Sequence, residues 1–331
     1  MAYSFAQSCF WFPGVVVIVG YTFQTICVTG TSGFIGSHVV PLLRRSGVSV
    51  RVFTRSAYMG CTGVEVYVGD LFDAASLVRF MEGADLLINL AQPSGSLTDE
   101  HFSTGMSNLA QAARVAGVRR VLHVSTAMVI GVPSADRVTE ETTGMPKTSY
   151  ERQKYAAEQV LHNEFGADVD LGILRPTAVF GDGGQNLLKL AGVIAEGSAL
   201  KRRLLRILHG KRKMHLVSVK VVVEAIIFLA FVPRSLAGNV FLIASDEEPD
   251  NNYQAVDAIL GGVLDKPLPR SSVSIPASLL SLLLRMAGRS QADPTLVYDS
   301  SKIRSWGFLY KSDFSAALKE FAEAYMKEKG D

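Results

Sequence analysis

Residues 29–36 read TGTSGFIG and place glycines at positions 30, 33 and 36, directly after a β-prone run at 24–28. The amphipathic pattern that follows, as far as Gly47, is typical of a helix. Because glycine has no Cβ atom, the backbone of such a turn can approach a diphosphate, and the helix N-terminus adds N–H groups and the positive end of a dipole. The stretch therefore predicts a strand, a dinucleotide-binding turn and a helix.

Apolar, β-prone runs recur after this turn and alternate with helical patterns, which is typical of a Rossmann-type, doubly wound parallel sheet with helices on both faces. We thus expect an α/β fold with a smaller, mainly helical C-terminal substrate lobe. The expected organisation is an extra N-terminal segment at 1–23, an NAD(P)-binding domain at 24–176 to which 216–245 return, and a substrate lobe formed by 177–215 and 246–331. Strands are expected at 24–30, 48–55, 64–70, 84–91, 118–126, 169–176 and 240–245.

The 331 residues are 48% hydrophobic and carry a net charge of +2, which excludes a disordered chain and predicts no general attraction to nucleic acid. Cys9, Cys27 and Cys61 lack disulfide or zinc-ligand spacing, and the six histidines are scattered, so no metal site and a reducing, cytoplasmic location are expected. The apolar run at 9–20 is shorter than the ~20 residues that span a bilayer and has no basic flank, so we expect no membrane span.

The second expected strand ends with Phe53-Thr54-Arg55, about where NAD-binding folds carry an acidic residue for the ribose 2′-hydroxyl. No carboxylate is present in this tripeptide. Because an arginine can pair with a 2′-phosphate, Arg55 favours NADP over NAD.

Tyr150 and Lys154 stand four residues apart in a helical pattern and so share a helix face. A lysine ammonium beside a phenol favours the phenolate, which lets the tyrosine exchange a proton near neutral pH. Tyr325 and Lys329 repeat the spacing, but only Tyr150 follows a strand whose carboxyl end faces the ligand crevice. We therefore interpret Tyr150 and Lys154 as catalytic and the later pair as a solvent-exposed helix end.

Ser125 and Thr126 end the strand that precedes this helix. A hydroxyl at that edge can bind a substrate oxygen and orient the tyrosine. His123, two residues earlier, is expected to be a hydrogen-bonded core residue.

The motifs at 29–36, 69–73 (GDLFD), 124–131 (VSTAMVIG), 150–154 and 174–184 (LRPTAVFGDGG) resemble, in order and spacing, those of the extended short-chain dehydrogenase/reductases, the NAD-dependent epimerase/dehydratase family. The resemblance covers about residues 25–326. Within the family the chain looks like bacterial nucleotide-sugar 4-epimerases and 4-ketosugar reductases. This implies a nucleotide-sugar substrate, NADP or NAD as cofactor, and a homodimer.

The resemblance also implies residue roles. Thr126, Tyr150 and Lys154 would be catalytic, and Ser125, Thr126, Asn186 and Arg212 would bind substrate. The expected cofactor-binding residues are Gly30, Ser32, Gly33, Phe34, Ile35, Gly36, Arg55, Asp70, Leu71, Ala91, Tyr150, Lys154 and Pro176.

Departures from the family pattern keep alternatives open. Met214 stands where an arginine often meets the nucleotide phosphates, and Phe102 and Ile130 replace an Asn and a Tyr. One alternative is an NADP-dependent dehydrogenase or reductase of a steroid-like or other apolar alcohol or ketone, which the apolar run at 278–288 favours. The other is a non-catalytic NADP-sensing protein, against which the retained Thr126, Tyr150 and Lys154 argue.

Overall fold

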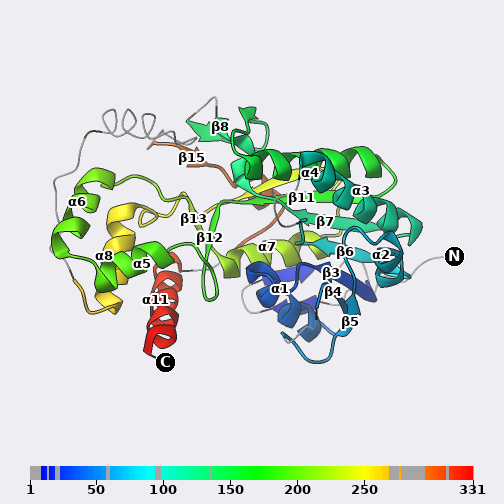
Figure 1. The fold of residues 1–331 in the computed structure, drawn as a ribbon, viewed down its shortest axis with the longest axis horizontal. Helices are drawn as coiled ribbons and strands as arrows, with labels where there is room; N and C mark the ends of the chain where they lie inside the picture. Colours follow the sequence, from blue (N-terminus) through cyan, green and yellow to red (C-terminus); the bar gives the residue numbers. More distant parts are fainter. Residues whose placement is uncertain are drawn as a thin grey trace.

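The computed structural model describes residues 9–12, 15–18, 23–56, 60–93, 98–133, 136–267, 276, 295–310 and 313–330. The apolar run at 278–288 lies outside these residues, as do parts of the N-terminal segment. The chain forms two lobes, one built around a large sheet and one mainly helical (Figure 1). None of the described helices is both long enough and apolar enough to cross a membrane.

The larger lobe contains a seven-stranded, fully parallel sheet with the order β14-β11-β7-β6-β3-β4-β5. Its central strands are buried on both faces, as a parallel sheet between helix layers requires. The predicted doubly wound α/β fold is confirmed. The strands are β3 (Thr25–Thr29), β4 (Ser49–Thr54), β5 (Glu65–Val68), β6 (Leu86–Asn89), β7 (Arg120–Val124), β11 (Asp170–Pro176) and β14 (Val240–Ile243).

Helices cover both faces of the sheet. α1 (Phe34–Arg45) and α7 (Val219–Phe231) pack on one face, and α2 (Ala74–Met81), α3 (Asp99–Val115) and α4 (Ser149–Phe165) pack on the other. Local sequence sets where several of them begin, because Asp73, Thr98 and Thr148 accept hydrogen bonds from the first turns of α2, α3 and α4. Thr148 and Glu151 form a reciprocal capping box that fixes the first turn of α4.

In the described part of the smaller lobe, three helices, α5 (Leu188–Glu196), α8 (Tyr253–Val263) and α11 (Phe314–Gly330), pack around an apolar core. A fourth helix, α6 (Ala199–His209), is attached to α8 through Arg202, Arg206 and Asp257. A short parallel pair, β12 (Ala178–Phe180) and β13 (Leu216–Ser218), lies between the lobes, and neither strand was among those expected. The expectation for Tyr325 was wrong: its side chain is buried in this core, while Lys329 pairs with Glu196 at 2.9 Å.

The remaining elements are short. β1 and β2 form an antiparallel hairpin within the N-terminal segment, and β2 lies against α7. β8 pairs with β10, and β9 pairs with β15. These elements are β1 (Cys9–Phe12), β2 (Val15–Ile18), η1 (Ala127–Ile130), β8 (Val132–Pro133), β9 (Arg137–Val138), β10 (Gly144–Met145), β15 (Val297–Tyr298) and α10 (Ser301–Ser305).

A buried arginine on β7 joins the sheet to the end of α7. Arg120 is 1% exposed and pairs with Asp170 of β11 at 2.8 Å. Asp170 in turn accepts hydrogen bonds from the backbone N–H groups of Leu236 and Ala237. The guanidinium also donates to the carbonyls of Leu229, Ala230, Val232 and Arg234.

We predict that Asp170→Ala lowers the free energy of unfolding by about 3 kcal/mol, because it leaves a buried guanidinium without its carboxylate. The control is Asp168→Ala, whose partner Arg114 is 47% exposed, and which should cost less than about 1 kcal/mol. Urea unfolding of both variants measures the difference. Equal losses would contradict the structural role assigned to the Arg120–Asp170 pair.

Candidate active site

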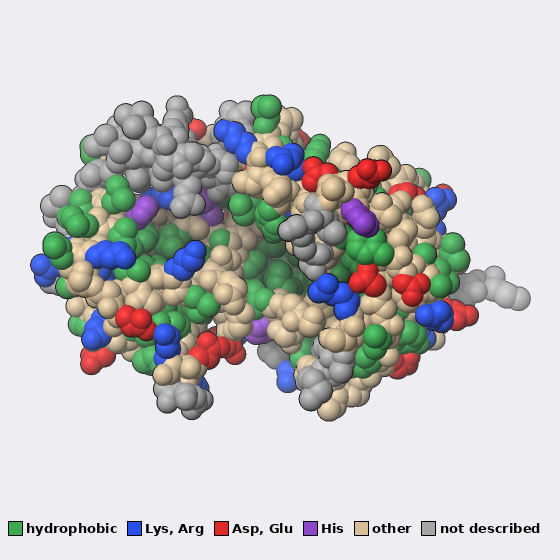
Figure 2. Space-filling view, in the orientation of Figure 1, with side chains coloured by type: hydrophobic (Ala, Val, Ile, Leu, Met, Phe, Trp, Pro, Cys, Tyr) green, Lys and Arg blue, Asp and Glu red, His purple; other side chains and the backbone are tan. Residues whose placement is uncertain are grey.

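A cleft of about 1040 Å³ opens at the carboxyl ends of the central strands and extends to the helical lobe. One end of it lies beside β3 and β6, where the strand order reverses direction and doubly wound sheets bind their ligands. Figure 2 shows the hollow between the lobes, with hydrophobic side chains on its floor.

The glycine turn lines this end of the cleft. Gly30 has a φ of +68°, and a Cβ atom there would lie 2.6 Å from the backbone nitrogen of Ala91. A Cβ atom at Gly36 would lie 2.5 Å from the carbonyl oxygen of Gly30. Gly33 precedes α1 without any side-chain cap, and the first turn of α1 has no acidic residue. The turn therefore presents a Cβ-free backbone and an uncapped helix N-terminus, which fit a dinucleotide diphosphate.

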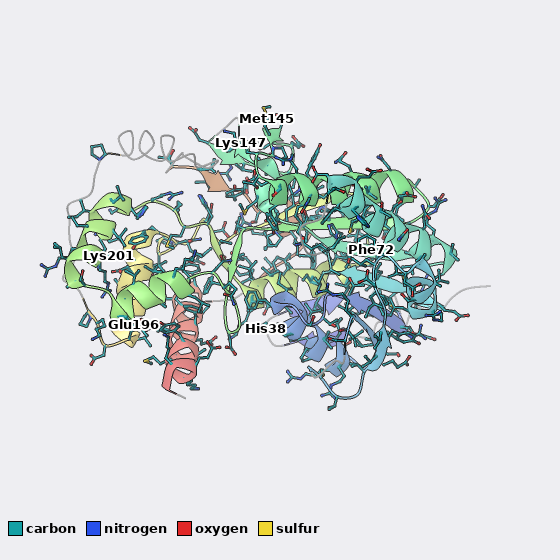
Figure 3. The ribbon with its side chains drawn as sticks, in the orientation of Figure 1. His38, Phe72, Met145, Lys147, Glu196 and Lys201 are labelled. Atoms are coloured by element: carbon teal, nitrogen blue, oxygen red, sulfur yellow. The ribbon has the colours of Figure 1, made fainter. Side chains whose placement is uncertain are left out.

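The loop after β12 is held against the start of α1. The Nε2 atom of His38 lies 3.0 Å from the carbonyl oxygen of Asp182, and the Phe34 and His38 rings meet edge to face. A Cβ atom at Gly184 would lie 2.7 Å from the Phe34 ring. His38 thus lies on the side of α1 that faces the helical lobe (Figure 3).

Most of the predicted site residues line the cleft together. These are Gly30, Gly33, Phe34, Ile35, Gly36, Ser125, Thr126, Tyr150, Lys154, Pro176, Asn186 and Arg212. Five others do not line it, namely Ser32, Arg55, Asp70, Leu71 and Ala91.

Those five still lie near the expected dinucleotide path. Arg55 is exposed immediately beyond β4, the neighbour of β3. Asp70 follows β5 and accepts a hydrogen bond from the N–H of Phe72 at 3.0 Å, and Leu71 is buried. Ala91 touches the glycine turn through its backbone.

Tyr150 and Lys154 enter the cleft from the first turns of α4. Tyr150 is 42% exposed, whereas Lys154 is 7% exposed. Partial burial raises the pKa of Tyr150, and a hydrogen bond with the Thr126 side chain acts in the opposite direction. Thr126 and Tyr150 meet because η1, which begins right after Thr126, packs against α4.

A buried acid lies one helical turn beyond the lysine. Burial lowers the pKa of Lys154 to about 8, and the charge of Glu158 opposes this change. Glu158 is 1% exposed and binds Arg175 of β11 through two hydrogen bonds of 2.5 and 3.0 Å. The row Tyr150, Lys154 and Glu158 therefore runs from the cleft into the interior along one face of α4.

Ser125 directly follows β7 and lines the cleft, whereas His123 lies within β7 and does not. The Ser125 hydroxyl is buried and has no hydrogen-bond partner among the described residues. His123 is buried, as expected, but only its Nδ1 atom has a partner, the side-chain amide of Asn89 at 2.9 Å. The expectation of a hydrogen-bonded core histidine is therefore met at one ring nitrogen.

Two cations, Arg212 and Lys213, line the half of the cleft next to the helical lobe, and two other arginines of the same run do not. Arg202 and Arg206 of the basic run at 201–213 point inward and share Asp257 of α8 at 2.7 and 2.8 Å. Lys213 donates to the carbonyls of Asp246 and Glu248.

Aromatic and apolar side chains that the sequence analysis did not select complete this half. His209 and Tyr253 stack with ring centroids 4.9 Å apart, and Met214 and Tyr298 line the same cleft. Asn186 donates to the carbonyl of Val179 at 2.7 Å. Asn186 and Met214 were singled out from sequence, but no local motif marks His209, Tyr253 and Tyr298, because they come from α6, α8 and β15, which meet only in the folded chain. Within the described part of the chain, no group of three His, Cys, Asp or Glu side chains could hold a metal ion.

The profile of the NAD dependent epimerase/dehydratase family matches residues 26–244. The chain belongs to this family. The match begins in β3 and ends just after β14, so it spans all seven strands of the large sheet.

Individual proteins similar to this chain fall into two groups, relatives by sequence and solved structures that share the fold. Sterol demethylase protein B of Methylococcus capsulatus is 34% identical over 172 residues, 48% of this chain and 52% of that protein. 3β-Hydroxysteroid dehydrogenase/Δ5→4-isomerase of Mycobacterium tuberculosis is 26% identical over 277 residues, 76% and 72% of the two chains. A crystal structure of UDP-glucose 4-epimerase superposes with a TM-score of 0.70 at 21% identity and covers 93% and 98% of the chains. The chain spans about half the length of several curated relatives that it matches.

The buried lysine makes stability depend on pH. Its pKa falls from 10.5 in the unfolded chain to about 8, so between these values the unfolded state binds more protons than the folded state. The contribution of Lys154 to the free energy of unfolding therefore rises with pH between these two values, by at most about 3 kcal/mol. We predict that Lys154→Met removes this rise in urea unfolding between about pH 7 and pH 10. The same substitution at the exposed Lys189 should leave the rise in place, and a rise that persists in Lys154→Met would refute the assignment.

Proposed function

We propose that the protein is an NADP-dependent dehydrogenase or reductase that interconverts a secondary alcohol and a ketone on a largely apolar substrate. The observation that carries the proposal is the substrate half of the cleft. It presents the side chains of Met214, Tyr253 and Tyr298, and of the two cations that line it, Arg212 and Lys213, the lysine already donates to the carbonyls of Asp246 and Glu248. An apolar molecule can pack on these side chains, whereas a diphosphate would have to draw Lys213 from its present partners or rely on Arg212.

In the proposed reaction Tyr150 transfers the proton at the substrate oxygen. The Thr126 hydroxyl, which interacts with Tyr150, donates a hydrogen bond to the same oxygen. Lys154 holds its charge one helical turn below and favours the phenolate form of Tyr150. The nicotinamide, when bound, gives or accepts hydride at its C4 atom. The glycine turn would hold its diphosphate, and Pro176 would line the nicotinamide end of the cleft.

The named relatives support an apolar substrate. Sterol demethylase protein B and the 3β-hydroxysteroid dehydrogenase/isomerase both carry a sterol or steroid in their names. The ceramide reductase of Caulobacter vibrioides, 31% identical over 183 residues, adds a lipid.

A nucleotide sugar is the second candidate, through 4-epimerisation or 4-keto reduction. Arg212 and Asn186 both line the cleft and favour this candidate, because a guanidinium and an amide suit a nucleoside diphosphate. The similarity to UDP-glucose 4-epimerase supports the shared fold alone.

We predict that the protein oxidises a 3β-hydroxysteroid with NADP⁺ and that Tyr150→Phe lowers turnover at least 100-fold, because the phenol carries the proton. Tyr155→Phe is the matched control, because Tyr155 also lies on α4 and, at 43%, is about as exposed as Tyr150. NADPH absorbance measures both rates, and the affinity for NADP⁺ should be unchanged in both variants.

The substrate class is tested by comparing the melting temperatures of the protein with different ligands in the presence of NADP⁺. A steroid alcohol should raise the melting temperature, and UDP, dTDP and GDP should leave it unchanged. If one nucleotide raises the melting temperature and the protein also turns over the sugar conjugate of that nucleotide, the proposal of an apolar substrate is rejected in favour of a nucleotide sugar. Absence of turnover with every alcohol and sugar would reject both candidates.

We also predict that Arg55→Ser weakens NADP⁺ binding about tenfold and leaves NAD⁺ binding unchanged, because only NADP⁺ carries the 2′-phosphate. Arg79→Ser, at another exposed arginine of the same lobe, is the control. Fluorescence titration with the two reduced cofactors measures both affinities. Equal losses for NADPH and NADH would show that Arg55 does not select the cofactor.

A further inference from the structure

Helix α6 turns two of its arginines toward the protein and two of its leucines toward solvent. Arg202 and Arg206 are buried, and both bind the carboxylate of Asp257 on α8, at 2.7 and 2.8 Å. Leu200 and Leu204 lie on the opposite side of the helix and are 69% and 58% exposed. A surface helix of a globular protein normally shows the reverse arrangement, with its apolar side facing the core. The outward leucines of α6 therefore need an explanation.

The outward face of α6 is apolar along its middle and basic along both edges. With about 3.6 residues per turn, Leu200, Leu204 and the half-buried Ile207 fall within about 60° of one another around the helix axis. Lys201 projects on one side of this stripe and Arg203 on the other, and both are exposed. We call these five residues the α6 outer face. Single exposed leucines are common at protein surfaces, but an apolar stripe between cations is typical of a helix that lies in a membrane interface.

The charge around the α6 outer face is positive. Residues 199–213 include no acidic side chain, and Lys211, two residues past the helix, is exposed as well. Across the described ranges of the chain, no acidic side chain pairs with Lys201, Arg203 or Lys211. Glu196, the nearest acid before the run, is already in an ion pair with α11 at 2.9 Å. The cations beside the leucines are therefore available to an anionic surface.

The α6 outer face lies at one end of the molecule. Among the labelled helices of the smaller lobe, α6 lies farthest from the large sheet (Figure 1), and Lys201 lies at this end, away from the hollow between the lobes (Figure 3). The last residue of α6, His209, lines the cleft. One helix thus connects an exposed apolar and basic face with the wall of the cleft.

A phospholipid bilayer with anionic headgroups matches both properties of the α6 outer face. The apolar side chains leave water when they enter the boundary between headgroups and acyl chains, and the cations stay at the level of the lipid phosphates. A nucleic acid would match the cations but would leave the leucines in water. A second copy of this chain, packed face to face, would bring the cations of the two copies together.

We propose that the α6 outer face docks on the surface of an anionic bilayer, with its three apolar side chains inserted among the headgroups and its two cations bound to lipid phosphates. Docking of this kind places α6 in the plane of the interface and needs no membrane-spanning helix. The ion pairs with Asp257 hold the arginine side of α6 against α8, which leaves the outer face free to meet the bilayer.

The proposed function gives the docking a purpose, and only this step rests on it. An apolar alcohol or ketone dissolves in the acyl region of a bilayer rather than in water. His209, at the cleft wall, lies about 14 Å along the helix from Leu200, so docking brings the cleft close to the membrane that holds such a substrate. The docking itself needs neither substrate nor cofactor.

Sedimentation of the unmodified protein with lipid vesicles tests the proposal. Vesicles of equal parts phosphatidylglycerol and phosphatidylcholine should bind it at least tenfold more tightly than vesicles of phosphatidylcholine alone, and added salt should weaken the binding. Leu200→Ser combined with Leu204→Ser should lower the affinity for the mixed vesicles at least tenfold, because the apolar contacts are lost. Leu309→Ser combined with Val115→Ser is the matched control, because these residues are 72% and 74% exposed but lie outside α6, and it should bind like the unmodified protein.

A charge reversal tests the same face without changing its apolar residues. Lys201→Glu should lower the affinity for the mixed vesicles about tenfold and leave the affinity for pure phosphatidylcholine vesicles unchanged. Lys189→Glu, at an exposed lysine of α5 in the same lobe, is the control and should lower the affinity much less. The melting temperature of each variant should match that of the unmodified protein, because every substituted side chain is exposed.

Three results would overturn the proposal. The first is an unmodified protein that does not bind the mixed vesicles, and the second is a double leucine variant that binds them as tightly as the unmodified protein. The third is a dimer in solution that the double leucine variant cannot form, which would assign the face to a second copy of the chain. Inactivity toward every alcohol would reject the proposed function and leave the vesicle result standing, whereas turnover without vesicle binding would reject the docking alone.

Discussion

A lysine ammonium held inside the protein is the constraint around which the cleft is organised. Lys154 is 7% exposed, and burying a charge of this kind is costly unless a counter-charge lies close by. Glu158 supplies that charge one turn along α4, and Arg175 holds Glu158 on the adjoining strand. The position of α4 on the sheet, and with it the position of Tyr150, depends on this chain of charges.

The glycine turn imposes a second constraint, at the part of the cleft that lies beside β3 and β6. Gly30 fits between β3 and β6 only because it lacks a side chain, and the same contact brings Ala91 against the turn. Ala91 is also the residue whose N–H orients Asn89. The glycine turn and the hydrogen-bonded side chains of Thr29, Asn89 and His123 thus share one backbone contact, at Ala91.

The sheet lobe could be predicted from sequence because its signals are local. Alternating apolar runs, the glycine spacing and the Tyr150–Lys154 spacing each depend on residues close together in the chain. The substrate half could not be predicted. The basic run at 201–213 looks exposed in sequence, but Arg202 and Arg206 are paired with Asp257, which lies more than forty residues away. Tyr325 was misjudged for the same reason, since the helices that bury it come from distant segments. The partners of His123 also lie on strands that only the folded sheet makes neighbours.

The Asp257 cluster has a consequence for how this cleft changes over evolutionary time. The carboxylate lies outside the cleft, yet it fixes α6, and α6 ends at His209 on the cleft wall. With the arginines turned inward, Leu200 and Leu204 of the same helix are 69% and 58% exposed. The part of the cleft wall at the end of α6 is therefore held in place by a residue that does not line the cleft. A substitution of Asp257 during evolution would remove what holds α6 in place without altering any residue that lines the cleft.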